Sequence, residues 1–374
     1  MTTRAPLLSM KPAKIPLPFW RQLGWNLILS FILLAILPVL IVTYVILDRT
    51  SKEATNQVYN QLDSVAELKN DQILRWLDEG DLAMTVFLSS SNLDQFITLA
   101  KTQAPSSKQQ ADVTAILVDT ADASQYFTRL FIYNPSGRVI ASSDPADVGK
   151  VVSDQPYFNV SLHADFIQSP LTNATADKVA MYILRPLRGS KIQPEGVLAG
   201  ELNIDTLASI MLKRTGLGES GETYLVSLDN NYLLTPSRFT DYELARAYHS
   251  VGIDRALNGE KGRGTYDSYR NPPVAVLGSY RFIPELQAAL LAEVEQSQAL
   301  AAFKQVQLVS VGATLLATLV ALTLGLLTAQ RISRPIRALT LSAQRIGEGN
   351  LKAEIDGVRR QDELGMLARS FSRM

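Results

Sequence analysis

The chain has 374 residues, of which 47% are hydrophobic and 19% charged, so it is neither disordered nor of low complexity. Its 36 basic and 36 acidic residues balance, which argues against a general nucleic-acid binder, because such proteins need a basic face. It has no cysteine and two isolated histidines, which excludes a disulfide scaffold, a cysteine nucleophile and thiolate metal sites. We therefore expect no metal and no cofactor, and no motif marks a catalytic residue.

Two long uncharged segments determine the predicted layout. Residues 26–47 and 306–328 contain no charged side chain, and at about 1.5 Å per residue each would cross the roughly 30 Å hydrocarbon core of a bilayer. A buried core helix is the alternative for both, and a cleaved signal peptide is the alternative for the first. We predict two transmembrane helices, because the runs are too long for ordinary core helices and no small-residue cleavage site follows the first.

The charges at the two ends predict the orientation. Residues 1–25 form an irregular basic tail with four basic and no acidic residues, and residues 329–374 carry nine basic and five acidic residues, so each end has a net charge of +4. The positive-inside rule places both ends in the cytoplasm. Residues 48–305 then form an extracytoplasmic domain at the inner (plasma) membrane, large enough to fold around an ordinary core without disulfides.

The exported region is predicted to be α+β. Apolar residues recur every three to five positions over 58–76, which predicts a long helix that continues from the membrane, and helical patterns return at 81–101 and 109–122. Period-two alternation then predicts antiparallel strands, beginning with a hairpin around the turn at 134–137. The predicted strands are 128–133, 138–142, 179–186, 196–203, 223–227, 232–235, 264–269, 274–283 and 288–294. Two successive groups of strands, each with helices to one side, predict two modules in tandem.

Residues 329–374 carry two heptad seams. The first consists of Ile332, Ile336, Leu339, Ala343 and Ile346, and the second of Leu364, Leu367, Phe371 and Met374. GlyGluGlyAsn at 347–350 ends the first helix, and AspGluLeuGly at 362–365 opens the second. Because two short helices cannot bury two seams alone, we predict a homodimer that forms a parallel four-helix bundle. A helical hairpin within one chain is the alternative.

Three segments of this region carry a family resemblance. ArgProIleArgAlaLeu (334–339), ArgIleGlyGluGlyAsnLeu (345–351) and AspGluLeuGlyMetLeuAlaArgSerPheSerArgMet (362–374) resemble a HAMP relay domain over 331–374. The resemblance implies that Pro335 marks the first helix near the membrane and that Glu363 opens the second. The expected relay residues are Pro335, Ile336, Leu339, Glu363, Leu367 and Phe371. We expect an effector beyond this chain, with a histidine kinase favoured over a chemotaxis-type signalling hairpin or a nucleotide cyclase.

The exported region resembles the double Cache family of extracytoplasmic sensors, which are tandem PAS-like modules on a long helix. The segments that carry the resemblance include SerAspGlnProTyrPhe (153–158), GlyValLeuAlaGlyGluLeuAsnIle (196–204) and GlyGluThrTyrLeuValSer (221–227). It implies a distal module at about 81–205, a membrane-proximal module at about 206–295, and a small-molecule pocket in the distal module.

Candidate ligand contacts gather in the distal module. The resemblance and the predicted strands together give Arg129, Tyr133, Asp154, Tyr157, Phe158, Tyr182, Glu201 and Asn203. A small polar ligand needs a few placed polar groups and aromatic walls, and Arg129 can pair a ligand carboxylate bidentately. Alternatively, Tyr157 and Phe158 are core residues, and Arg129 and Asp154 are solvated or paired with each other.

The resemblance also bears on the ligand. Amino-acid-binding members of the family typically carry an Arg two positions before the aromatic pair and an Asp on the later strand. Those positions are Gln155 and Glu201 here. The absence of the Arg argues against an α-amino acid and leaves carboxylic acids, amines and nucleobase-like compounds open.

Other readings remain. Gly216, Gly218 and Gly221 spell G-x-G-x-x-G, but a predicted helix precedes the motif and a strand follows it, which is the reverse of a dinucleotide site, so we expect a turn. A membrane-anchored domain that binds a protein or an envelope polymer is the main alternative to a small-molecule receptor, and an exported hydrolase is a third. We favour transmembrane signal transduction, with a lipid bilayer, a small molecule and a second copy of the chain as partners and no nucleic acid.

Overall fold

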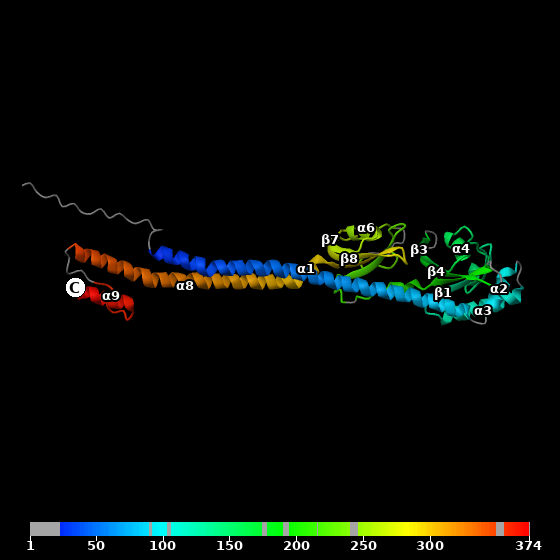
Figure 1. Cartoon of the computed structure of the whole chain (residues 1–374), viewed down its shortest axis with the longest axis horizontal. Helices are drawn as coiled ribbons and strands as arrows, with labels where there is room; N and C mark the ends of the chain where they lie inside the picture. The colour runs from blue at the N-terminus through cyan, green and yellow to red at the C-terminus, as the bar shows by residue number, and fades with distance from the viewer. Residues whose placement is uncertain are drawn as a thin grey trace, which may run out of the picture. The chain divides into compact units, whose positions relative to one another are not determined.

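The computed structural model describes residues 23–89, 92–102, 106–173, 178–189, 194–214, 216–239, 246–348 and 355–373. The chain divides into two compact units. One comprises Glu53–Ala302, and the other comprises Met1–Lys52 together with Phe303–Met374. The first helix, α1 (Leu23–Leu88), contributes residues to both units (Figure 1).

The unit Glu53–Ala302 contains an antiparallel five-stranded sheet in its distal module, with strand order β2-β1-β5-β4-β3. The strands are β1 (Phe127–Tyr133), β2 (Val139–Ser142), β3 (Phe166–Asn173), β4 (Lys178–Leu187) and β5 (Gly196–Leu202). Helices α2 (Leu93–Lys101) and α3 (Ser107–Ala123) join α1 on one face of the sheet (Figure 1). The short helices η2 (Pro145–Asp147) and α4 (Pro156–Ser161) lie outside this helical layer, and α4 contacts β3 and β4.

Alternation along the strands separates two apolar clusters in this module. Leu130 and Ile132 of β1 and Leu198 of β5 pack with Ile73 and Trp76 of α1 in the main core. The intervening side chains point to the opposite face of the sheet, where aromatic residues of the strands and of α4 gather. Burial of a large apolar side chain stabilises a fold by about 1.5–3 kcal/mol. The main core therefore fixes the sheet against α1 and leaves its other face for the aromatic cluster.

The membrane-proximal module follows helix α5 (Ile204–Leu212) and has a four-stranded antiparallel sheet of order β6-β9-β8-β7. The strands are β6 (Glu222–Ser227), β7 (Gly262–Asp267), β8 (Ala275–Ile283) and β9 (Ala288–Glu295). One face packs on Leu62, Val65 and Ala66 of α1. Helix α6 (Val251–Leu257) covers the other face, and the short helix α7 (Gln296–Ala299) follows β9 directly.

The antiparallel α+β prediction is confirmed, and three local predictions were wrong or incomplete. Strand β3 escaped prediction because Pro170 interrupts its pattern at a bulge in an edge strand. Residues 232–235, predicted as a strand, form only isolated bridges between Leu233 and Val226 and between Tyr232 and Ala247. Helix α6 was missed because it is short and contains a glycine, although Ser250 caps it through the Ile253 amide.

The second unit is built from α1, α8 (Ala301–Gly347) and α9 (Glu363–Ser372). Among the described residues, one helix, Phe303–Gly347, is long and apolar enough to cross a membrane. The predicted first span lies within α1 and stays a prediction. Its described apolar side chains are largely exposed in the single chain, as Leu34 shows at 79%. The Thr43 and Thr314 hydroxyls lie 2.8 Å apart and join α1 to α8, a contact typical of packed membrane helices.

Candidate functional site

Strand register brings three of the predicted ligand residues into one row on the open face of the distal sheet. Arg129 of β1 pairs with Glu201 of β5, and Glu201 pairs with Tyr182 of β4. Residues directly opposite each other in antiparallel strands project to the same face with Cβ atoms about 4.5–5.5 Å apart. Three residues that are far apart in the sequence therefore form one polar row across the centre of the sheet.

Charged groups surround this row. Arg129 donates to Glu201 Oε2 from Nε at 2.9 Å and from Nη2 at 2.5 Å, and its Nη1 donates to Asp147 Oδ2 at 3.0 Å. Lys150 contacts the other oxygen of Asp147 at 2.5 Å. The side chain of Asp147 is only 5% exposed, whereas that of Arg129 is 36% exposed. Arg129 thus forms ion pairs with two carboxylates of the same chain, that of Glu201 on β5 and that of Asp147 on η2.

Aromatic rings form the neighbouring wall. Tyr157 of α4 stacks on Tyr182 with ring centroids 5.6 Å apart, and Phe131 meets Tyr182 edge-on at 6.2 Å. The Arg129 guanidinium lies 5.6 Å from the Phe131 centroid. Tyr133 and Phe158 pack together deeper in the cluster, edge to face at 5.9 Å. Both Tyr133 and Phe158 are almost fully buried, and Tyr133 packs against the Phe131 ring.

The pKa directions of these groups report the local charge. Burial, followed by the nearby Asp154 and Glu201 carboxylates, raises the pKa of Tyr157 to about 12. Burial and Glu201 raise the pKa of Tyr182 further still. Burial alone would lower the pKa of Arg129, but its attraction to Glu201 and Asp147 reverses the direction. The two stacked tyrosine rings therefore stay neutral at physiological pH, mainly because they are buried, and carboxylates lie near both of them.

The predicted ligand residues do not all meet. Arg129, Tyr133, Tyr157, Phe158, Tyr182 and Glu201 lie together in the cluster just described. Asp154 is exposed beside Tyr157. Asn203 lies past the end of β5, where its side chain accepts from the Asp205 amide and caps α5. Asp147 was missed, because nothing in its ProAlaAsp segment distinguishes it from a surface turn until the register places Arg129 opposite.

No metal site emerges in the part of the chain that the structure describes, where no group of three or more His, Asp or Glu side chains is arranged to hold an ion. The carboxylates of the distal cluster are instead bound by Arg129 and Lys150.

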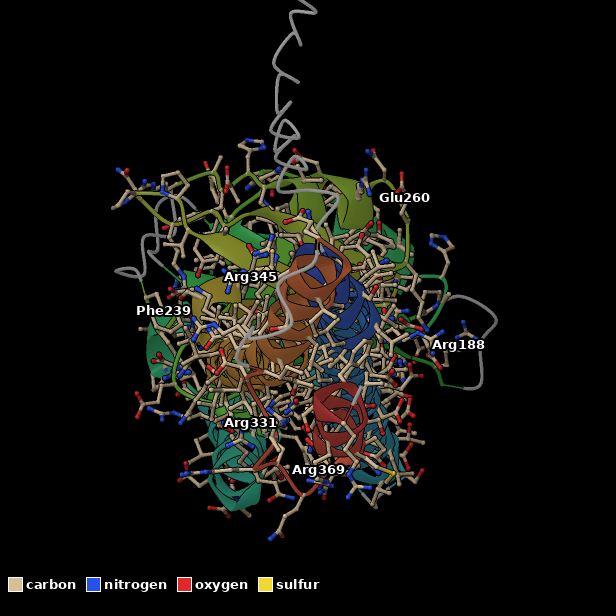
Figure 2. All side chains as sticks on the ribbon, turned by 90° about the vertical axis from the view of Figure 1, so that its left-hand side faces the viewer. Arg188, Phe239, Glu260, Arg331, Arg345 and Arg369 are labelled. Atoms are coloured by element: carbon tan, nitrogen blue, oxygen red, sulfur yellow. The ribbon has the colours of Figure 1, made fainter. Side chains whose placement is uncertain are left out.

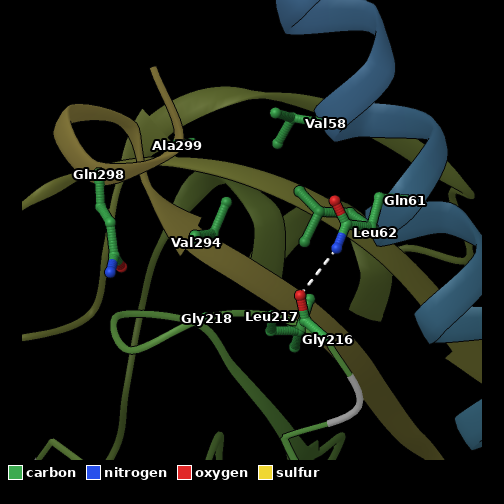
Figure 3. Close-up of a pocket in the computed structure, with 9 residues that line it drawn as sticks. All are labelled: Val58, Gln61, Leu62, Gly216, Leu217, Gly218, Val294, Gln298 and Ala299. Carbon is green, nitrogen blue, oxygen red and sulfur yellow. Dashed lines mark hydrogen bonds between the residues drawn. The ribbon is translucent and has the colours of Figure 1, made fainter. Parts of the chain in front are cut away.

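A second, separate feature is a pocket of about 200 Å³ between α1 and the membrane-proximal sheet (Figure 3). Val58, Leu62 and Val294 line it with apolar groups. The glycine motif forms its edge, where Gly216 and Gly218 have positive φ angles of 81° and 71°. Gln61 of α1 donates to the Gly216 carbonyl at 2.8 Å. The motif is therefore a tight turn that contacts α1, as expected.

The predicted relay residues lie on α8 and at α9. Helix α8 continues through Pro335, with Ile336 partly buried and Leu339 6% exposed. Glu363 is the first residue of α9, and Asp362 caps that helix by accepting from the Gly365 amide at 3.0 Å. Phe371 is partly buried, whereas Leu367 of the predicted second seam is 47% exposed in the single chain. Arg331, Arg345 and Arg369 are the labelled basic residues of this region in Figure 2.

A proline and an arginine connect the two helices of this region. Because Pro335 has no N–H, the Arg331 carbonyl lacks its usual helical donor. Arg360 Nη2 reaches that carbonyl at 3.5 Å, and the same guanidinium binds the Asp362 carboxylate at 2.6 Å. The Arg360 hydrogen bonds hold the pKa of Asp362 down at about 2. The capping carboxylate of α9 is thereby tied to the proline turn of α8.

Comparisons with known proteins agree with this architecture. The sequence profile of the Cache domain family matches residues 50–303, and that of the HAMP domain family matches residues 327–374. The methyl-accepting chemotaxis protein McpA of Bacillus subtilis is 24% identical in an alignment 366 positions long, which covers 95% of this chain and 51% of McpA. The chain thus spans about half the length of that curated relative.

Solved structures of sensor domains resemble the sensor region of this chain. The sensor domain of the histidine kinase DctB of V. cholerae superposes with a TM-score of 0.50 at 16% identity, covering 64% of this chain and 98% of that one. The sensory domain of the Campylobacter jejuni chemoreceptor Tlp3 has a TM-score of 0.48 at 10% identity, covering 67% of this chain and 99% of that one. The chain belongs to the Cache domain family and, with its HAMP domain, has the architecture of a transmembrane signalling receptor.

Proposed function

We propose that this chain is the sensory and relay part of a bacterial receptor whose distal module binds a small ligand with a cationic amine group. The observation that carries the proposal is the pair of carboxylates, Asp147 and Glu201, beside the stacked rings of Tyr157 and Tyr182. Aromatic faces attract ammonium groups, the more so when carboxylates lie close by. The exposed Asp154 adds a third carboxylate at the rim.

The state of Arg129 supports an amine over a carboxylic acid. Its Nε and one Nη hydrogen-bond to Glu201, and its other Nη to Asp147. An anionic ligand would have to separate these charges and leave Glu201 without its cation. An amine can instead take the place of the guanidinium, so that the two carboxylates keep a cation, and lie against Tyr157 and Tyr182. This differs from the role first considered for Arg129, which was to hold a ligand carboxylate.

The relay in this proposal runs from the distal sheet to the membrane. A ligand shifts a conformational equilibrium only by binding the two states differently. Strand β5, which carries Glu201, continues through Asn203 into α5, and the carbonyls at the end of α5 accept from Lys69 of α1. We propose that residues 26–47 of α1 and 306–328 of α8 both cross the plasma membrane, with both ends cytoplasmic. They pass a small shift to a dimeric HAMP bundle, which repacks.

The proposal also covers the kind of effector that the receptor controls. McpA, a methyl-accepting chemotaxis protein, is similar across the Cache and HAMP regions alike, and this favours a chemotaxis-type effector. The likeness to the sensor domain of DctB, a histidine kinase, rests on the fold of the sensor region. A chemotaxis-type effector and a histidine kinase would use the same sensory and relay parts, so a test of the ligand does not depend on which effector is present.

The ligand proposal is tested with the purified full chain in lipid nanodiscs, by following thermal unfolding in panels of amines, carboxylic acids, amino acids and purines. A ligand at about 100 times its dissociation constant stabilises by roughly 2.7 kcal/mol, which raises the melting temperature by several degrees. We expect hits among the amines, lost in Glu201→Gln and Tyr157→Ala and kept in the exposed control Asp119→Asn. Stabilisation by carboxylic acids alone would contradict an amine ligand, and no stabilisation in any panel would favour a protein or polymer partner.

A further inference from the structure

The membrane-proximal sheet contains two buried carboxyl groups directly opposite each other. Glu222 of β6 pairs with Glu293 of β9, and the two residues are 3% and 0% exposed. Paired residues in antiparallel strands share a face, with Cβ atoms about 4.5–5.5 Å apart. Two negative charges at that separation, away from water, repel strongly unless one of them is neutralised.

The two carboxyls have unequal partners. Glu222 accepts from Arg270 Nη2 at 3.1 Å, from Tyr269 at 3.0 Å and from Ser237 at 3.0 Å. Glu293 accepts from the Tyr224 hydroxyl at 2.8 Å. Burial, outweighing the Tyr224 hydrogen bond and reinforced by Glu222, raises the pKa of Glu293 to about 7. Glu222 is therefore the member of the pair that is bound to a cation, and Glu293 is the member that exchanges a proton near neutral pH.

Among the residues that the structure describes, the groups around Glu293 provide no second cation. Those that face it are Glu222 and Tyr224 of β6, Tyr266 of β7, Tyr269 and Arg270 after β7, and, farther along the sheet, Tyr280 of β8, which binds Arg255 of α6. Gly278 of β8 is the strand partner of Glu293. The Tyr266 hydroxyl lies so close to Gly278 that a Cβ atom on this residue would overlap the hydroxyl. In this described set Arg270 is the cation nearest Glu293, and it is already bound to Glu222.

Arg270 also contacts the turn that precedes β6, and this turn is hydrogen-bonded to α7. Besides Glu222, its Nη2 reaches the Ser220 carbonyl at 3.3 Å. The Ser220 amide donates to Gln298 of α7 at 2.7 Å, and the Ser220 hydroxyl accepts from the Glu295 amide at 3.2 Å. Gln298 lies in the wall of the pocket beside α1 (Figure 3). A polar chain thus runs from the carboxyl pair to α7, which precedes α8 in the sequence.

We propose that Glu293 is a proton-binding site that controls the contact between the Ser220 turn and α7, so that the membrane-proximal module responds to external pH independently of the distal ligand. When the Glu293 proton leaves to solvent, two adjacent carboxylates compete for Arg270. The guanidinium moves from Glu222 towards a position between them, and its bond to the Ser220 carbonyl weakens. Ser220 then holds Gln298 and Glu295 less firmly, and α7 shifts relative to α1.

The test uses the full chain in lipid nanodiscs, with spin labels on cysteines introduced at Gln57 of α1 and Ser297 of α7. Both positions are exposed, and the chain has no other cysteine. We expect a pH-dependent change in the distance between the labels, about one-tenth complete one pH unit below a midpoint near 7 and about nine-tenths complete one unit above it, as one titrating group requires. Glu293→Gln should hold the low-pH distance throughout. Glu260→Gln, whose side chain points to solvent (Figure 2), should titrate like the parent.

A second measurement needs no variant of Glu293. Infrared difference spectra of the unlabelled chain should show a protonated carboxyl band that disappears between pH 6 and 8, a range centred on about 7. An unchanged label distance across this range, or the same titration in Glu293→Gln, would overturn the proposal. So would the absence of the infrared band. Because no amine is added, these outcomes are independent of the test of the distal ligand.

Discussion

Arg129 and Tyr266 show how single side chains decide what each sheet face can do. Arg129 is balanced between Asp147 and Glu201 and remains 36% exposed, so its surroundings are open to a ligand. Tyr266 lies on the face of the proximal sheet that α6 covers, where its hydroxyl contacts Gly252 and Gly278 with no room for a Cβ on either. The distal face therefore carries a partly exposed cation, whereas Tyr266 fills the space over the two glycines of the proximal module.

At the residue scale, Gly278→Ala should destabilise the membrane-proximal module. The new methyl group overlaps the Tyr266 hydroxyl and forces that ring off Glu293, and such overpacking costs about 1–3 kcal/mol. Gly264→Ala is the matched control, because Gly264 pairs directly with Gly278. A methyl group added at Gly264 would lie 3.9 Å from the nearest atom of Tyr266, an ordinary contact distance. Urea unfolding of the two variants compares them, and equal stability would show that the Tyr266 packing is loose.

At the scale of elements, Lys69 ties α1 to α5. It is fully buried, and its ammonium donates to the carbonyls of Ile210 and Lys213 at the end of α5. A cation at a helix C-terminus is favourable, but burial, followed by repulsion from Lys213, lowers the pKa of Lys69 from 10.5 to about 8. The contact between α1 and α5 therefore contains a buried charge, which burial disfavours.

The pH dependence of stability should report this charge. Between pH 8 and 10.5 the folded state binds fewer protons at Lys69 than the unfolded state, so the free energy of unfolding rises with pH in that window. The contribution is fully present above 10.5 and lost as the pH falls through 8. As the pH rises, the melting temperature of the parent should therefore increase relative to that of Lys69→Met. Lys108→Met, on the exposed surface of α3, should keep a constant difference from the parent.

Arg360 has the same linking role between α8 and α9. Arg360→Ala removes the donor to the Arg331 carbonyl and to the capping carboxylate of Asp362. Losing support for a cap typically costs about 1 kcal/mol, so the first turn of α9 should fray. Hydrogen exchange at the Gly365 and Met366 amides should accelerate several-fold. Arg359→Ala removes an exposed neighbouring arginine and should leave both rates unchanged.

Periodicity predicted most of the elements, but not the pairs that depend on register. The alternation at 128–133 was enough to predict β1, and the cap at Asp362 was readable from its AspGluLeuGly segment. Strand β3 was missed because Pro170 breaks its pattern. The carboxyl pair of Glu222 and Glu293 was invisible, because it depends on which residues of β6 and β9 face each other. The same holds for Asp147, whose partner lies 18 positions away.

At the scale of the whole molecule, the dimer prediction can be tested separately from the ligand. Since the sequence has no cysteine, single cysteines at Ile336 and Leu367 report on the two predicted seams without background. We expect both to crosslink two chains in membranes, and a cysteine at the exposed Arg337 to crosslink far less. Leu367 is 47% exposed in the single chain, as expected for a seam residue that a second chain would cover. Equal yields at all three positions would contradict a parallel bundle.

The guanidinium of Arg129 has a consequence for how such a receptor sets its sensitivity. An amine that binds beside Asp147 and Glu201 competes with a group that is covalently part of the chain and always at the site. The apparent dissociation constant is then the intrinsic one divided by the fraction of molecules in which Arg129 has given way. Strengthening or weakening the ion pair between Asp147 and Arg129 would move the response threshold up or down without altering the tyrosine rings against which the amine lies. Lys150, which binds the far oxygen of Asp147, is the natural place for such tuning.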